Sequence, residues 1–184
     1  MNNANKLTIL RVILIPIFVA LYMVGCNGIF TLKFVATIIF IIASITDYFD
    51  GVIARKYNLV TNFGKLLDPL ADKMLVISSL LLITVNGDIN VVFTIVIVLR
   101  EIIISAIRLI ALEQGEVIAA SKIAKYKTAT QMISMIMIML DLHKINTMFY
   151  ILTYAVFYIS FILTVLSLLD YIIKSKNVIL KNGI

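Results

Sequence analysis

Four aspartates lie between residues 47 and 72, in a part of the chain that is otherwise rich in apolar side chains. Asp47 and Asp50 are three residues apart, so they share one face of a helix. Asp68 and Asp72 are four apart and share a face of a second helix. The linker between them allows a hairpin in which the two acidic faces oppose each other. Carboxylates this close repel one another unless cations intervene, and Mg²⁺ or Mn²⁺ suits their oxygens.

Small residues and one arginine are interleaved with these aspartates. Gly51 and Ala54 lie on or beside the first acidic face and Gly64 on the second, where a larger side chain would block a ligand. Arg55 can donate two parallel hydrogen bonds to a phosphate group. The combination predicts a slot for a phosphorylated ligand beside a metal site.

The acidic residues also have simpler explanations. Asp68 followed by Pro69 could cap the start of a helix, and Asp47 and Asp50 could be solvated charges at a helix end. Carboxylates near a helix C-terminus oppose the helix dipole, however, and Asp72 has no capping role. Because ionisable residues in or beside apolar segments are functional by default, we favour the metal site.

The composition indicates that these residues belong to a membrane protein. Of 184 residues, 62% are hydrophobic and 14% are charged, whereas soluble domains have about 45–50% and about 25%. The mean hydropathy of +1.09 agrees. These values exclude a disordered chain, and the single cysteine, Cys26, excludes a disulfide scaffold.

We expect an all-α, polytopic membrane fold with six transmembrane helices. A spanning helix needs about 20 mostly apolar residues, and such runs recur without the alternation of barrel strands. Since no repeat or soluble appendage is evident, residues 1–184 are expected to form a single membrane domain. The expected helices cover residues 8–26, 30–54, 69–86, 90–112, 126–142 and 147–173.

The basic residues predict the orientation of these helices. Nearly all Lys and Arg fall on one side, and only Lys33 and Lys144 fall on the other. The basic side is cytoplasmic, so both termini and the acidic segment of this multi-pass protein face the cytoplasm from the cell (inner or plasma) membrane. There the net charge of +6 would meet anionic lipid head groups and phosphorylated substrates. No nucleic acid partner is expected.

The acidic segment resembles the signature of a known family, the CDP-alcohol phosphatidyltransferases. That signature is Asp-x2-Asp-Gly-x2-Ala-Arg-x8-Gly-x3-Asp-x3-Asp, and the chain fills every fixed position of it. The resemblance implies a six-helix membrane enzyme, usually a homodimer, with a binuclear Mg²⁺ or Mn²⁺ site. It also implies transfer of a substituted phosphoryl group from a CDP-linked donor to an alcohol, with release of CMP. The matching residues are Asp47, Asp50, Gly51, Ala54, Arg55, Gly64, Asp68 and Asp72.

The resemblance assigns roles to individual residues. The expected catalytic residue is Asp72, as the base that accepts the proton of the attacking hydroxyl. The expected metal ligands are Asp47, Asp50, Asp68 and Asp72. The residues expected to bind the donor, CDP-diacylglycerol, are Asn5, Thr8, Asp47, Gly51, Ala54, Arg55 and Gly64.

Three further stretches resemble the phosphatidylglycerophosphate synthases of this family, which implies glycerol 3-phosphate as the acceptor. A cluster of cations suits the dianionic phosphate of this acceptor better than it suits serine or inositol. The stretches are Asn5-Lys-Leu-Thr8-x2-Arg11 with Pro16, Arg100-Glu101-x3-Ser105-x2-Arg108, and Ser121-x3-Lys125-x-Lys127-Thr128-x2-Gln131. The residues expected to bind glycerol 3-phosphate are Arg100, Arg108, Ser121, Lys125 and Lys127.

Several alternatives stay open. Lys125 and Lys127 could be interfacial residues whose long side chains reach the membrane surface, and Glu101, directly after Arg100, makes a poor helical partner for it. His143 is expected to be solvated in an outer turn. The acceptor could be phosphatidylglycerol, as in cardiolipin synthesis, or serine or inositol. A divalent-cation transporter would instead need acidic residues near the bilayer midplane in several helices.

Overall fold

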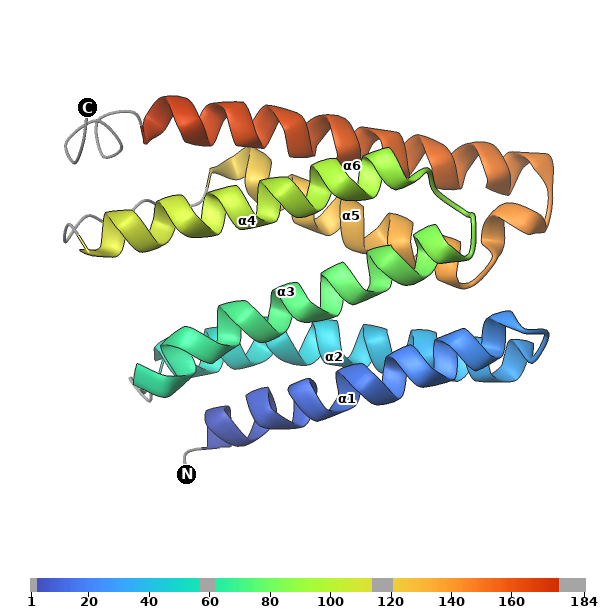
Figure 1. Ribbon diagram of the computed structural model, residues 1–184, viewed down its shortest axis with the longest axis horizontal. Coiled ribbons are helices and arrows are strands. Elements are labelled where there is room, and N and C mark those ends of the chain that lie inside the picture. The colour runs from blue at the N-terminus through green and yellow to red at the C-terminus, as the bar shows by residue number, and fades with distance from the viewer. Residues whose placement is uncertain (1–2, 57–61, 114–120, 176–184) are drawn as a thin grey trace. The chain divides into compact units, whose positions relative to one another are not determined.

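The computed structural model describes residues 3–56, 62–113 and 121–175 (Figure 1). In this part of the chain every regular element is a helix, as expected for an all-α fold. Side chains are described for residues 10–46, 73–111, 121 and 123–175. The helices are α1 (Asn3–Cys26), α2 (Phe30–Lys56), α3 (Asn62–Val85), α4 (Val91–Glu113), α5 (Lys122–Met139), the 3₁₀ turn η1 (Leu142–Lys144) and α6 (Thr147–Lys174).

The helices follow the six apolar runs of the sequence, but α1, α3 and α5 begin before the predicted residues 8, 69 and 126, and α3 differs most. α3 begins at Asn62, whereas the apolar run predicts a start at residue 69. Asp68 and Pro69 therefore lie inside α3, and Asp68 does not cap its N-terminus. The capping explanation for Asp68 is wrong because the helix already begins six residues earlier, at Asn62.

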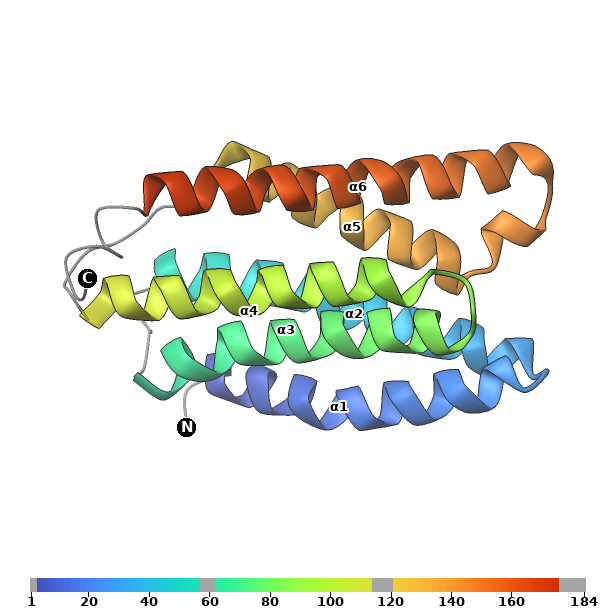
Figure 2. The same cartoon turned by 45° about the horizontal axis from the view of Figure 1, so that its top comes forward.

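The helices form two groups, Met1–Asp88 and Ile89–Ile184, which are described separately. In the first group α1 packs against both α2 and α3 (Figure 2). Phe18 of α1 is fully buried, and its ring centroid lies 5.9 Å from that of Phe40 in α2 and 6.1 Å from that of Tyr22. Aromatic pairs at this separation add to the stabilisation from buried area.

Gly25 allows α1 and α2 to approach closely where they leave and enter the turn between them. A Cβ atom at Gly25 would lie 2.4 Å from the backbone nitrogen of Lys33. Small residues permit such backbone contact between membrane helices. Lys33 itself is 4% exposed, and its Nζ lies 5.4 Å from the ring centroid of Tyr22, a cation–π distance.

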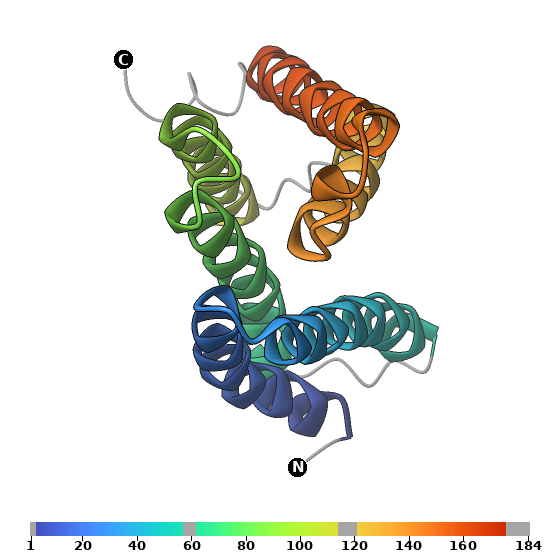
Figure 3. The same ribbon diagram turned by 90° about the vertical axis from the view of Figure 1, so that its right-hand side faces the viewer.

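In the second group α6 contacts α4, α5 and η1, and Figure 3 shows α5 beside α6. Phe93 of α4 meets Phe157 and Phe161 of α6 edge-on, with ring centroids 5.6 and 4.8 Å apart. His143 in η1 is 8% exposed, and its ring lies 5.8 Å from that of Tyr154 in α6. The expectation that His143 is solvated is therefore wrong, since the turn packs back against α6.

On α6 the buried face carries four small hydroxyl residues and two aromatic residues, whereas large apolar side chains lie on the exposed face. Ile159, Ile162 and Ile173 are 52%, 56% and 73% exposed. This arrangement is unfavourable in water but suits lipid, where small polar residues pack between helices. Among the described helices, α6 is the one long and apolar enough to cross a membrane, and shorter apolar helical segments lie at Leu10–Cys26, Phe30–Thr46 and Lys73–Val85. The buried residues of α6 are Thr153, Phe157, Ser160, Thr164, Ser167 and Tyr171.

Candidate active site

The backbone of the acidic segment is helical on both sides of residues 57–61. Asp47 and Asp50 lie near the end of α2, and Asp68 and Asp72 lie in the first half of α3. The spacing of three in α2 and of four in α3 therefore places each pair on one helix face, as predicted. The side chains of the signature residues, and those of Asn5 and Thr8 in α1, lie outside the described residues. The metal site and the donor site thus stay predictions.

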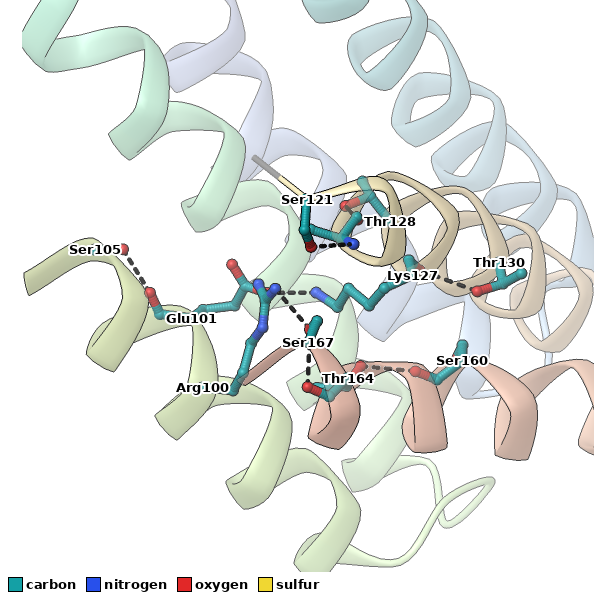
Figure 4. Close-up of polar contacts among 11 residues, drawn as sticks. Arg100, Glu101, Ser105, Ser121, Lys127, Thr128, Thr130, Ser160, Thr164 and Ser167 are labelled. Atoms are coloured by element: carbon teal, nitrogen blue, oxygen red, sulfur yellow. Dashed lines mark hydrogen bonds and ion pairs between the residues drawn. The ribbon is translucent and has the colours of Figure 1, made fainter. Parts of the chain in front are cut away.

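A second charged cluster is described in full, in the interior of the other helix group (Figure 4). Glu101 Oε1 accepts a hydrogen bond from Arg100 Nη1 at 2.8 Å and another from Lys127 Nζ. Arg100 is 6% exposed and Lys127 is 3% exposed. Buried charges are costly unless they are paired and hydrogen-bonded. Here two cations of α4 and α5 share one carboxylate, so these three residues together carry a net positive charge.

The stripe of hydroxyls on α6 completes this cluster. Arg100 Nη2 donates a hydrogen bond of 2.9 Å to Ser167 Oγ, and Ser167 Oγ donates one of 2.9 Å to the carbonyl oxygen of Thr164. The guanidinium of Arg100 is thus held by Glu101 of α4 and Ser167 of α6, while the ammonium of Lys127 reaches Glu101 from α5. We name Arg100, Glu101, Lys127 and Ser167 the cation cluster.

Glu101 is the residue whose role sequence reasoning missed. Adjacent helical residues make poor pairs, so no contact with Arg100 was expected, yet the structure has one at 2.8 Å. The reason is tertiary, because Glu101 also bonds Lys127 of α5 and Arg100 also bonds Ser167 of α6. The available signal was that an acid within an apolar helix needs a compensating cation. Sequence spacing alone does not identify Lys127 as that cation.

The five residues predicted to bind the acceptor do not all lie together. Arg100 and Lys127 meet in the cation cluster. Lys125 is exposed whereas Lys127 is buried, because residues two apart in a helix lie on different faces. The explanation of Lys127 as an interfacial residue that reaches the membrane surface therefore does not fit. Arg108 is exposed and its guanidinium carbon lies 5.7 Å from the ring centroid of Tyr171. Ser121 caps α5, and its hydroxyl oxygen accepts a hydrogen bond of 3.2 Å from the Ala124 N–H.

Comparisons with known proteins agree with the signature in α2 and α3. The family model described as CDP-alcohol phosphatidyltransferase matches residues 1–166. A Bacillus subtilis protein named CDP-diacylglycerol–glycerol-3-phosphate 3-phosphatidyltransferase is 43% identical over 143 residues, which cover 72% of this chain and 74% of that protein. A Haemophilus influenzae protein of the same name is 39% identical over 180 residues, 96% of this chain and 94% of its own. A third, from Rickettsia bellii, is 39% identical over 140 residues, 76% of this chain and 75% of its own.

Proposed function

The chain belongs to the CDP-alcohol phosphatidyltransferase family, and from this premise we propose that it transfers the phosphatidyl group of CDP-diacylglycerol to glycerol 3-phosphate. The products are phosphatidylglycerophosphate and CMP, a step of phospholipid synthesis. The observation that carries the choice of acceptor is the cation cluster, in which Arg100 and Lys127 are buried with a single carboxylate between them. The names of the relatives point to the same acceptor.

The cation cluster binds the phosphate of the acceptor. A dianionic phosphate is attracted by the net positive charge that two cations sharing one carboxylate retain. In an interior of low dielectric constant this attraction is stronger than in water. Serine has no dianionic group and inositol has no charge, so neither would balance Arg100 and Lys127. Entry of the phosphate is assisted by two further cations, Lys125 near the start of α5 and Arg108 near the end of α4. Ser121 assists at the N-terminus of α5, since a helix N-terminus also attracts anions.

The acidic faces of α2 and α3 hold the metal ions. The donor set consists of the carboxylates of Asp47, Asp50, Asp68 and Asp72, which is the chemistry that Mg²⁺ or Mn²⁺ prefers. The helical backbone of α2 and α3, with spacings of three and four between these aspartates, supports a binuclear site. When bound, the ions neutralise the diphosphate of the donor and stabilise the departing CMP.

The chain's own residues position the reactants, which is most of what phosphoryl transfer requires. Arg55 donates hydrogen bonds to the diphosphate, and Gly51, Ala54 and Gly64 leave room for the donor beside the helices. Asn5 and Thr8 contact the donor from α1. The acceptor hydroxyl oxygen forms a bond to the phosphorus that bears the diacylglycerol, and the bond from that phosphorus to the CMP oxygen breaks. Asp72 accepts the hydroxyl proton.

The protein works as a multi-pass protein of the cell membrane, with its active site on the cytoplasmic side. We place all six helices across the bilayer and both termini in the cytoplasm, with residues 1–184 as one membrane domain that forms a homodimer. The exposed apolar faces support this, as in α6, and so does the lipid nature of the donor. Membrane lipids are therefore direct neighbours of the protein.

The test is metal-dependent release of CMP by the purified protein in detergent micelles that contain CDP-diacylglycerol. We expect CMP only when glycerol 3-phosphate and Mg²⁺ or Mn²⁺ are both present, and loss of activity on chelation. Asp50→Asn should abolish release. Asp141→Asn is the matched control, because Asp141 pairs with the exposed Lys144 and asparagine tolerates its positive φ of 56°. Metal-independent release would contradict the proposal.

A further inference from the structure

Gln131 is a buried residue whose side-chain amide has no hydrogen-bond partner in the described part of the chain. It is 3% exposed, and in the described part of the chain neither Nε2 nor Oε1 of its side chain has a hydrogen-bond partner. The backbone carbonyl of Gln131 does have a partner, because it accepts a hydrogen bond of 2.9 Å from Ser134 Oγ. The side-chain amide therefore keeps a donor and an acceptor available within the helix group.

An unpaired amide in the interior lowers stability compared with an apolar side chain of similar size. The buried hydroxyls of Ser160 and Thr164 differ from Gln131, because α6 itself satisfies them. Ser160 donates to the carbonyl of Phe157, and Thr164 donates to that of Ser160. Bonds within α6 thus account for these two hydroxyls, whereas α5 supplies no such bond to the amide of Gln131. Gln131 is suited to a ligand that brings both a donor and an acceptor.

Gln131 lies one helical turn from the cation cluster. Lys127 and Gln131 are four residues apart in α5 and both are buried, so they share a face, with a rise of about 6 Å between them at about 1.5 Å per residue. The ammonium of Lys127 bonds Glu101 on α4. Arg100 also retains an unused donor, since its buried Nε has no hydrogen-bond partner among the described residues. The cation cluster thus retains a spare donor on α4, and α5 carries a spare amide one turn from Lys127.

We propose that Gln131 binds the middle hydroxyl of glycerol 3-phosphate and is a specificity-determining residue for the acceptor. The inference rests on the proposed function, because it takes the phosphate to bind at Arg100 and Lys127. A hydroxyl donates one hydrogen bond and accepts others, which matches the two open atoms of the amide. A three-carbon polyol phosphate has about the length of one helical turn, so its phosphate and hydroxyl reach Lys127 and Gln131 together. The hydroxyl that attacks the donor is the terminal one and stays free to react.

The test compares glycerol 3-phosphate with 3-hydroxypropyl phosphate, which keeps the phosphate and the terminal hydroxyl but lacks the middle hydroxyl. We expect the wild-type protein to prefer glycerol 3-phosphate by about tenfold in kcat/KM, the loss typical of one hydrogen bond. Gln131→Met should lose this preference, with kcat/KM falling about tenfold for glycerol 3-phosphate and staying unchanged for the analogue. It should also melt at the wild-type temperature or above, since methionine leaves no unpaired amide.

Thr153→Val is the matched control. Thr153 Oγ1 is another buried atom without a hydrogen-bond partner among the described residues, at the opposite end of α6 from Ser167, and valine keeps its shape. This variant should retain the full preference for glycerol 3-phosphate. The inference is overturned if Gln131→Met reduces kcat/KM for both acceptors equally, or if Thr153→Val also removes the preference. If the wild-type protein turns over neither acceptor, the proposed function itself fails.

Discussion

Glu101 determines whether Arg100 and Lys127 can remain buried side by side. One oxygen of its carboxylate accepts hydrogen bonds from both, and its own side chain is 15% exposed. Glu101→Gln leaves two buried cations without a counter-charge, which costs about 3–5 kcal/mol when one partner of a buried pair is removed. We expect a clearly lower melting temperature in detergent, and a higher KM for glycerol 3-phosphate. Melting at the wild-type temperature would show that the carboxylate does not hold the cations.

Lys127 and Lys125 provide a matched pair for the phosphate site, because one is buried and the other is exposed. Lys127→Met should raise the KM for glycerol 3-phosphate by about 10–100-fold, the value of a hydrogen bond to a charged group. Lys125→Met should change it by no more than about threefold, since solvent and salt screen an exposed charge. Steady-state kinetics at constant ionic strength measures both. Equal effects of the two substitutions on this KM would show that the cation cluster does not bind the acceptor.

Asp72 is the predicted base, and its contribution can be separated from metal binding. Asp72→Asn should lower kcat by about 10²–10⁴-fold, the range for general acid–base catalysis. Asp68→Asn serves as the comparison, because a residue that is only a metal ligand should mainly raise the metal concentration needed for half-maximal activity. Metal titrations and pH–rate profiles of both variants distinguish a catalytic base from a metal ligand. Near-normal turnover by Asp72→Asn would rule out the role as base.

At the scale of single residues, sequence reasoning identified Arg100 and Lys127 but not the contact that joins them. Their types and their positions in apolar helices were enough to indicate a phosphate site. The pairing through Glu101 depends on how α4, α5 and α6 pack, and so does the burial of Lys127 while Lys125 is exposed. Gln131 belongs to the stretch from Ser121 that resembles the phosphatidylglycerophosphate synthases. Only the burial of its side-chain amide without a partner among the described residues indicates a role.

At the scale of helices, the apolar runs predicted where most helices lie because spanning length and hydrophobicity are properties of local sequence. α6, expected over residues 147–173, is Thr147–Lys174. α3 differs most, since Gly64, Lys65 and Asp68 lower the hydropathy of its first residues, yet these residues continue the helix from Asn62. Hydropathy therefore marks the apolar part of a helix and underestimates a polar extension such as the one that carries Asp68.

The crossing of α1 and α2 gives a prediction at this scale. Gly25→Ala places a methyl group 2.4 Å from the backbone nitrogen of Lys33, so the two helices must move apart. Overpacking of this kind costs about 1–3 kcal/mol, and we expect a lower melting temperature in detergent. Ala20→Val adds bulk at an exposed position of the same helix and should leave melting unchanged. An unchanged melting temperature for Gly25→Ala would contradict the close crossing.

At the scale of the whole molecule, the orientation of α6 tests the proposed topology. In a Cys26→Ser background, Ile145→Cys places a thiol at an exposed site before α6, and Lys174→Cys places one at the other end. We expect a membrane-impermeant maleimide to label Ile145→Cys in intact spheroplasts and to label Lys174→Cys only after permeabilisation. The reverse pattern would place the termini outside, and labelling of both in intact cells would show that α6 does not span the membrane.

The central claim is that this protein joins glycerol 3-phosphate, and no other alcohol, to the phosphatidyl group of CDP-diacylglycerol. The most direct measurement is a competition in one vessel, with the purified protein, Mg²⁺, CDP-diacylglycerol and equal concentrations of glycerol 3-phosphate, serine, inositol and phosphatidylglycerol. Mass spectrometry identifies the lipid products, and CMP is measured in parallel. We predict phosphatidylglycerophosphate as the lipid product, formed in equal amount to CMP. Cardiolipin, phosphatidylserine or phosphatidylinositol as the main product would contradict the account.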